Sequence, residues 1–501
     1  MKRIVYLVAI AGLVISSCTQ KQQAPNILFV FADQLRSHEL SSYGGENIQT
    51  PNLDRLAREG VRITNALSTY PICSPYRAML ISGLYPMRNG MTNNDHPYRP
   101  ELTSFAEACN QAGYQTAFIG KWHLDGHGRT AYIPTERREG FQFFQALECT
   151  HNYFESAYYD NDSEELTYWD DYDALSQTKA AQSYIQKRNK DQPFFLMLSW
   201  GPPHDPYIAP KAYMDKVKAE NLELRPNFSE RVEAQKLLEN PRFTLPERYQ
   251  KTRIKYQGHL ADTVFIREMN AGYLAATMAL DDYMCDLLKT LEEEGILENT
   301  IVVFTSDHGD HLGSHGIWGK DTPFEESISI PLIIRYPEKI PASTVSDVLF
   351  TPIDVMPTIL GMAGVDCPKV DGSDLSRVLV KKAPDTRDAA LIMGMSHFCN
   401  ASVINGMDTW RGVRTKKYTY ARYEDQTAWL LYDNEEDPYQ MNNLAEDPAY
   451  AGLIADLNVK LDQLLKEAGD AENTQKLYDK IIKENPKRTM LLDIREVNAG
   501  L

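Results

Sequence analysis

The sequence has little cysteine and no excess of positive charge, and each shortage excludes a class of protein. Seven cysteines are spread over 501 residues, with no zinc-finger spacing and far too few for a disulfide scaffold. Acidic residues outnumber basic ones by 69 to 52, and the formal net charge of −17 argues against a nucleic-acid partner. No internal repeat, heptad pattern or low-complexity run is present. With an apolar fraction of 43%, the chain has the composition of an ordinary globular protein.

The sequence also lacks an apolar run long enough to span a bilayer. The longest one, Ile4–Ile15, follows a basic start and leads through two serines to Cys18. This pattern is typical of a bacterial lipoprotein signal, in which the lipoprotein-processing machinery lipidates Cys18; an ordinary secretory signal is the alternative. We therefore expect residues 1–17 to be a signal peptide and residues 18–24 a tether. The mature protein would lie in the bacterial cell envelope, either in the periplasm or at the cell surface. Only its lipid anchor would attach it to a membrane.

Continuous apolar runs rich in β-branched residues predict strands that are buried on both faces. They are Asn26–Ala32, Thr116–Gly120, Phe194–Trp200, Thr300–Ser306 and Pro331–Pro337. Stretches with helical periodicity lie between them, and in one of these Thr50 is the expected N-cap, Pro51 the first turn and Gly60 the end. This alternation predicts an α/β fold, with a large, mostly parallel sheet sandwiched by helices.

The pattern of apolar and charged residues changes after about residue 380. Short strands joined by charged turns are followed by a helix from about Ala451 to Ala468, and a lysine-rich tail begins at Asn473. We expect a catalytic domain over residues 25–380. A smaller C-terminal subdomain, an antiparallel sheet with a helix and a helical tail, would occupy residues 381–501.

Polar residues rich in His, Lys and Asp follow four of the predicted strands. The four groups are Asp33 and Gln34; Lys121 and His123; His204 and Asp205; and Asp307, His308, Asp310 and His311. Loops after strands are polar in most proteins, but ligands of doubly wound sheets bind outside the carboxyl ends of the strands. Four such groups together favour one shared pocket. The oxygens of Asp33, Gln34 and Asp307, with His308, suit Ca²⁺ or Mg²⁺ better than zinc.

Cys73 precedes a helix-forming run that has Pro75 in its first turn. This would place the thiol at a helix N-terminus, where free N–H groups favour an anion. Arg77 follows one turn later and could hold that anion. A structural cysteine, or a thiolate nucleophile with a lowered pKa, are the alternatives.

These segments resemble the type I sulfatases of the alkaline phosphatase superfamily. CSPYR at residues 73–77 resembles their C-x-P-x-R maturation motif, and GYQTAFIGKWH at 113–123 resembles their second signature. TPNLDRLAREG, NTIVVFTSDHG and PLIIRYP occur in the family's order, and the similarity runs from about Asn26 to the mid-400s. The resemblance implies an alkaline-phosphatase-like fold and a sulfuric ester hydrolase. Tyr76 and Gln34 depart from the residues most common in the family.

The resemblance also implies the cofactors and the site residues. A formylglycine-generating maturation enzyme would oxidise Cys73 to formylglycine, an aldehyde that is hydrated to a diol. The metal, Ca²⁺ or alternatively Mg²⁺, would be held by Asp33, Gln34, Cys73, Asp307 and His308. The catalytic set would comprise Arg77 and Lys121 to orient the diol, Lys320 on a sulfate oxygen, His204 as the acid for the leaving alcohol, and His123 on the diol hydroxyl.

Further residues of polar and aromatic loops are candidates for substrate binding, with loop packing as the alternative. They are His96, Arg99, His151 and His311, and His315 lies close to the same region. The expected substrate is a sulfated carbohydrate, such as N-acetylglucosamine 6-sulfate or galactose sulfate of glycosaminoglycan or mucin-type glycans. The alternatives are a phosphonate or phosphodiester hydrolase of the same superfamily and an inactive glycan-binding lipoprotein.

Overall fold

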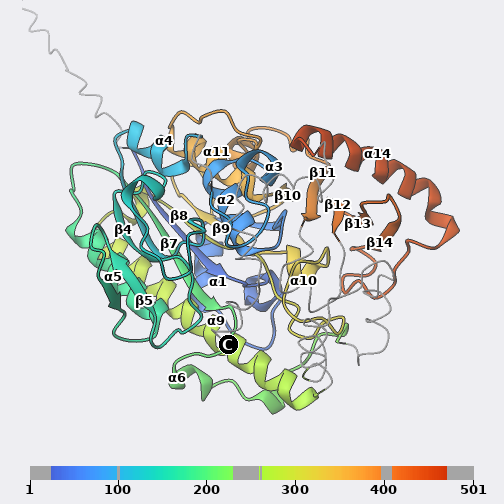
Figure 1. Cartoon of the computed structure of the whole chain (residues 1–501), viewed down its shortest axis with the longest axis horizontal. Coiled ribbons are helices and arrows are strands. Elements are labelled where there is room, and N and C mark those ends of the chain that lie inside the picture. Colours follow the sequence, from blue (N-terminus) through green and yellow to red (C-terminus); the bar gives the residue numbers. More distant parts are fainter. Residues whose placement is uncertain (1–23, 99–101, 229–258, 260–261, 396–408, 471–501) are drawn as a thin grey trace, which may run out of the picture.

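The computed structural model describes residues 24–98, 102–228, 259, 262–395 and 409–470 (Figure 1). The predictions for the signal peptide, for Cys18, for Arg99 and for the tail from Asn473 lie outside these residues. Among the helices that are described, none combines the length and the apolarity needed to cross a membrane.

A ten-stranded sheet forms the centre of the molecule, with the strand order β10-β2-β9-β8-β1-β7-β3-β4-β5-β6. In chain order the strands are β1 Asn26–Asp33, β2 Val61–Ala66, β3 Gln115–Lys121, β4 Phe143–Leu147, β5 Ala157–Asp160, β6 Leu166–Tyr168, β7 Phe194–Pro203, β8 Thr300–Ser306, β9 Leu332–Arg335 and β10 Thr344–Phe350. All five predicted runs form strands of this sheet. β1 pairs in parallel with both β7 and β8, whereas β9 runs antiparallel to β8 and β2.

Helices cover both faces of this sheet, as predicted. Alternate residues of β1 take part in two separate hydrophobic clusters: Leu28 and Val30 pack with α1, α5 and α9, and Ile27 and Phe29 pack with α2, α4 and α11. The helices are α1 Pro51–Glu59, α2 Cys73–Ser82, α3 Pro86–Asn89, α4 Phe105–Gln111, α5 Asp173–Lys187, α6 Lys211–Met214, α9 Thr263–Glu293, α10 Glu325–Ile328, α11 Pro352–Ala363 and α12 Ser376–Leu379. The short 3₁₀ helices are Ser37–Glu39, Ser41–Tyr43, Thr135–Arg137, Ala219–Asn221, Leu297–Asn299 and Pro448–Tyr450.

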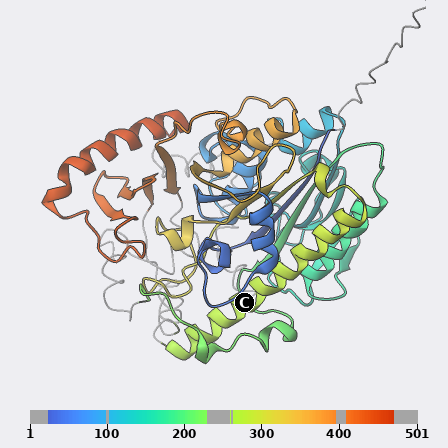
Figure 2. The same cartoon turned by 180° about the vertical axis from the view of Figure 1, so that it is seen from behind.

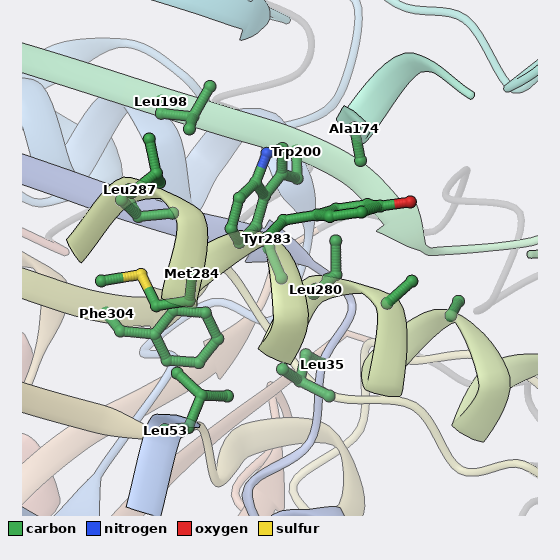
Figure 3. Packing of buried hydrophobic residues seen from close by; sticks show 14 of the residues in the cluster. Leu35, Leu53, Ala174, Leu198, Trp200, Leu280, Tyr283, Met284, Leu287 and Phe304 are labelled. Atoms are coloured by element: carbon green, nitrogen blue, oxygen red, sulfur yellow. The ribbon is translucent and has the colours of Figure 1, made fainter. Parts of the chain in front are cut away.

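The long helix α9 supplies much of one layer of the core. Its residues Leu280, Met284 and Leu287 lie among the side chains of Trp200 and Phe304 from the sheet (Figure 3). The apolar face of α9 packs on strands that are themselves buried, and this packing excludes water from that face of the sheet. The strand ends are thereby held in fixed positions.

The start of α1 has the predicted position, but its first N–H groups have an unpredicted partner. Thr50 occupies the N-cap position but makes no side-chain cap; its backbone N–H and its hydroxyl are hydrogen-bonded to Ser41 instead, at 2.8 and 2.9 Å. The first N–H groups of the helix donate to the carboxylate of Asp281 on α9, from Leu53 at 2.8 Å and from Asn52 at 3.2 Å. Thr50 is thus the N-cap residue, as predicted, but a carboxylate distant in the chain, and not the Thr50 side chain, satisfies these donors.

A second, four-stranded antiparallel sheet lies beside the first, as predicted for the C-terminal region (Figure 2). Its strands are β11 Ala389–Gly394, β12 Trp410–Thr415, β13 Tyr418–Tyr423 and β14 Ala428–Asp433, and α14 Ala451–Ala468 covers one face. Apolar side chains of its other face pack against Ile317, Phe324 and Ile328 of the larger part. The small sheet thus supports the loop that carries Lys320.

Candidate active site

The predicted polar groups meet at the carboxyl ends of adjacent strands. Asp33 is the last residue of β1 and Lys121 the last of β3, while Asp307 follows β8 and His204 follows β7. Because β1 lies between β8 and β7, and β7 lies next to β3, parallel pairing brings these four ends together. The sequence-based expectation of one shared site agrees with this arrangement.

Cys73 lies at the centre of this site, as the first residue of α2. Its Sγ is 3.3 Å from His308 Nε2, 3.4 Å from Lys320 Nζ and 3.8 Å from Lys121 Nζ. Burial and Asp33 raise the pKa of Cys73, but Lys121, Lys320 and His308 outweigh them and hold it well below its usual range. The surroundings therefore stabilise negative charge at position 73.

Arg77 joins the two carboxylates of the site. It lies one turn after Cys73 on α2, is 2% exposed, and its Nη2 donates to Asp33 Oδ2 and to Asp307 Oδ2 at 3.1 Å each. Its Nη1 donates to the Lys121 carbonyl at 2.6 Å and to Ser199 Oγ at 2.8 Å. Such a buried, doubly paired guanidinium fixes both carboxylates in place.

Lys121 reaches the same centre because the chain bends just before it. Its Nζ donates to Asp33 Oδ2 at 2.6 Å. Gly120 has a φ of +108°, and a Cβ at this position would lie 2.0 Å from the Ser199 carbonyl oxygen. Only glycine fits this approach, so the strand can end with the lysine directed at Asp33.

Asp33, Cys73, Asp307 and His308 form a buried group that can hold a metal ion, with ligand atoms within 4.8 Å of one another. His308 Nδ1 lies 3.0 Å from the Gly309 carbonyl. A carbonyl only accepts, so Nδ1 must carry the proton there, and in the neutral ring Nε2 then presents a lone pair. Nε2 lies 3.5 Å from Asp307 Oδ1 and 3.8 Å from Asp33 Oδ1. Two carboxylates and one imidazole fit a divalent cation.

Gln34 is adjacent to this group. Its backbone N–H donates to Asp307 Oδ1 at 2.9 Å, and its side-chain oxygen accepts from Lys320 Nζ at 2.6 Å. The amide oxygen therefore lies on the same side as the predicted ligands, and Lys320 links it to position 73.

His204 has one ring nitrogen engaged and one available. Its Nδ1 is 2.8 Å from the carbonyl and 2.9 Å from the carboxylate of Asp205, and its ring stacks on His151 at 4.4 Å. Among the described residues, no protein group hydrogen-bonds its Nε2. Burial and Lys320 lower the pKa of His204, but Asp205 and Asp33 outweigh them, and the net shift is upward. A histidine held in its protonated form can serve as an acid.

His123 is held by a residue that the sequence did not single out. Its Nε2 is 3.3 Å from Asp95 Oδ1, and Asp95 is also paired with Arg129 at 3.0 Å. Burial lowers the pKa of His123, whereas Cys149 and Asp95 raise it to about 10. Its Nδ1 is buried without a hydrogen-bond partner in the described part of the chain.

The residues predicted to bind substrate lie in different surroundings. His151 packs against His204, and His96 is buried with Nδ1 3.4 Å from Thr92 Oγ1. His311 is fully buried, and both of its ring nitrogens are engaged, by the Ser314 carbonyl at 3.1 Å and by Thr322 Oγ1 at 2.7 Å. Burial lowers its pKa to about 3. His311 therefore holds the loop between β8 and Lys320 and offers no free atom to a substrate.

Cys149 is a further residue of the site that had no clear signal in the sequence, and Asp310, which the sequence placed in the polar group after Thr300–Ser306, has a partner that the sequence did not predict. Cys149 is buried with its Sγ 3.7 Å from His151 Nε2, and burial raises its pKa while Lys121 and His123 outweigh that effect and lower it. Asp310 accepts a hydrogen bond from the Gln34 amide. Cys73, Cys109, Cys149, Cys285 and Cys367 are free thiols, so no disulfide joins the described cysteines.

Comparison with known proteins gives consistent matches over most of the chain. The family model described as Sulfatase matches residues 25–365, and the one described as N-sulphoglucosamine sulphohydrolase, C-terminal, matches residues 313–467. The ulvan-active sulfatase of Formosa agariphila is 38% identical over 463 residues, covering 91% of this chain and 83% of that protein. The N-acetylglucosamine-6-O-sulfatase of Bacteroides thetaiotaomicron is 29% identical over 534 residues, covering 94% and 92%.

A solved structure shows the same similarity in three dimensions. It contains a protein in complex with its substrate D-glucosamine-2-N,6-O-disulfate. The TM-score is 0.78 at 28% sequence identity, and the match covers 91% of this chain and 100% of that one.

Proposed function

Because the chain belongs to the sulfatase family and is a sulfuric ester hydrolase, we propose that it removes sulfate from a carbohydrate through a nucleophile formed at Cys73. The observation that carries the proposal is the surroundings of position 73. The cations Lys320 and Lys121 lie 3.4 and 3.8 Å from the Cys73 Sγ, and His308 and Asp33 lie 3.3 and 3.7 Å from it. An anionic ester needs cations to absorb charge, and a nucleophile needs a fixed position.

In this proposal Cys73 is converted to formylglycine by a maturation enzyme that reads the segment from Cys73 to Arg77. A hydrated aldehyde supplies the attacking oxygen and a second hydroxyl that lets sulfate leave without attack of water at sulfur. Arg77 and Lys121 orient the hydroxyls, and Lys320 Nζ binds a sulfate oxygen. His123 acts on the hydroxyl that does not attack, whose proton is lost as sulfate leaves.

The metal in this proposal is Ca²⁺, with Mg²⁺ as the alternative. It would be held by Asp33, Gln34, Asp307, His308 and the oxygen at position 73. A divalent cation supplies Lewis-acid stabilisation of negative charge on the sulfate oxygens. The predominance of oxygen donors supports this choice over zinc, which prefers His and Cys.

His204 is the proposed acid. A sugar alcohol is a poor leaving group, so its oxygen must receive a proton as the S–O bond breaks. Asp205 holds Nδ1, which leaves Nε2 as the atom that can deliver this proton. The upward pKa shift of His204 keeps the proton available near neutral pH.

The substrate is proposed to be a sulfated sugar of a glycosaminoglycan or mucin-type glycan, with N-acetylglucosamine 6-sulfate or galactose sulfate first. The name of the Bacteroides relative and the disulfated glucosamine in the solved structure support a 6-sulfated glucosamine. The name of the Formosa relative makes ulvan the necessary comparison. The expected lipid anchor at Cys18 would keep the enzyme in the cell envelope, where external glycans are met.

The test is turnover by the matured protein across a panel of defined sulfated saccharides that includes ulvan fragments, with an aryl phosphodiester beside them. Release of sulfate from a sugar in the panel, at a higher kcat/KM than phosphodiester cleavage, is the expected result. Faster phosphodiester hydrolysis would favour the phosphonate or phosphodiester alternative, and binding without turnover would favour the inactive glycan-binding one.

A further inference from the structure

The backbone of Gln34 is fixed in an unusual conformation. Its φ of 70° lies in the left-handed region, which a non-glycine residue seldom adopts. The N–H donates to Asp307 Oδ1 at 2.9 Å, and the carbonyl accepts from the hydroxyl of Tyr273 on α9 at 2.8 Å. These two bonds offset the strain of the turn. The fixed backbone therefore sets the direction in which the Gln34 side chain extends from the end of β1.

The side-chain amide of Gln34 lies between two groups of opposite character. Its Nε2 donates to Asp310 Oδ2, and its Oε1 accepts from Lys320 Nζ at 2.6 Å. An ionised carboxylate only accepts hydrogen bonds and an ammonium only donates them. The orientation of the amide is thus determined by its neighbours: the NH₂ group must face Asp310, and the oxygen must face Lys320 and position 73.

Asp310 can impose this orientation because both of its oxygens face donors. It is fully buried, and its Oδ2 accepts from the Tyr207 hydroxyl at 2.8 Å as well as from Gln34. Its Oδ1 accepts from the Leu312 N–H at 3.0 Å. An asparagine at this position would have to direct its NH₂ group at one of these donors. A buried pair of donors facing each other is costly.

We propose that Asp310 is a positioning residue that makes Gln34 a metal ligand, by holding the amide nitrogen away from the metal side. This inference rests on the metal site of the proposed function. If the amide were reversed, its NH₂ group would face Lys320 and the predicted cation, and neither can accept a hydrogen bond from it. In this chain the group that accepts from the amide nitrogen, and so keeps the oxygen on the metal side, is the carboxylate of Asp310.

The experiment is a calorimetric titration with calcium of the full-length protein after removal of metal by a chelator. Asp310→Asn keeps the size of the side chain and is expected to weaken calcium binding by about 10–100-fold, the usual effect of losing a group that orients a ligand. Tyr207→Phe is the matched control, since it removes the other donor to Oδ2 and leaves the Asp310–Gln34 pair intact. It should weaken calcium binding much less.

A double variant separates positioning from a general loss of structure. Gln34→Glu alone places two carboxylates in contact and should also weaken calcium binding. Gln34→Glu with Asp310→Asn restores complementarity, because the new NH₂ group faces a carboxylate and the new carbonyl faces Leu312. Recovery of calcium affinity in the double variant, above both single variants, is the expected result.

Two results would overturn the inference alone: wild-type affinity in Asp310→Asn, or a double variant no better than Asp310→Asn. A wild-type protein that binds no calcium or magnesium would instead overturn the proposed metal site, and this inference with it. Sulfate release by the wild type, measured in parallel, keeps these failures distinct.

Discussion

Replacing His204 by alanine should affect two kinds of substrate very differently. A positioned acid contributes about 10²–10⁴-fold to a step of this kind, or about 2.7–5.4 kcal/mol of barrier. A sugar oxygen needs that proton, whereas nitrophenolate leaves without one. His204→Ala should therefore lower kcat/KM for a 6-sulfated glucosamine by about 10²–10⁴-fold, and for nitrophenyl sulfate by a much smaller factor.

The structure provides the reason to expect a clean difference. The ring of His204 is held by Asp205 through Nδ1 and by stacking on His151 at 4.4 Å, so its removal leaves the groups around Cys73 in place. The assay is steady-state kinetics of the matured enzyme on both substrates. His127→Ala is the control, because the His127 side chain is 47% exposed and lies outside the proposed set. Equal losses on the two substrates would refute the acid role of His204 and make Lys320 the next candidate.

The remaining predictions concern pH, metal and location. Asp205→Asn removes a carboxylate that raises the pKa of His204. His204 then loses its proton at lower pH, so the alkaline limb of the pH–rate profile for a sugar sulfate should shift to lower pH. An unchanged alkaline limb would show that it reports the titration of another group. Asp33→Ala should abolish activity with the fold retained by circular dichroism, and elemental analysis of the wild type should find calcium or magnesium; stoichiometric zinc with full activity after calcium chelation would contradict this. Cys18→Ala should release the protein from the membrane fraction of its bacterial host, and a variant that stays bound would exclude the lipoprotein signal.

The arrangement of the fold could be predicted where strands are long and continuously apolar. β1, β7 and β8 are buried along their whole length, so their side chains carry the signal directly. β6, Leu166–Tyr168, is short and mostly exposed, and nothing in its composition distinguishes it from a loop. The convergence of Asp33, Lys121 and Asp307 could be predicted because each follows a buried strand, and the carboxyl ends of parallel strands lie at the same edge of a sheet.

The partners of the site residues could not be predicted in the same way. Asp95 lies 28 residues before His123, and Asp310 lies 276 residues after Gln34. A hydrogen bond between groups so far apart depends on the packing of several elements and leaves no local pattern. The same reason explains Thr50, whose expected capping role is taken by Asp281 from α9. The position of His311 after β8 suggested a site residue. Its side chain is buried, however, and the Ser314 carbonyl and the Thr322 hydroxyl engage its two ring nitrogens.

The identity of residue 73 tests the account most directly. Trypsin should release the peptide of residues 63–77, which ends at Arg77, from active enzyme purified from its native envelope. Mass spectrometry should find formylglycine in place of Cys73 in this peptide, with the lower mass of the aldehyde and reactivity toward a hydrazide. Full sulfatase activity in a preparation whose peptide carries only unmodified cysteine would contradict the account.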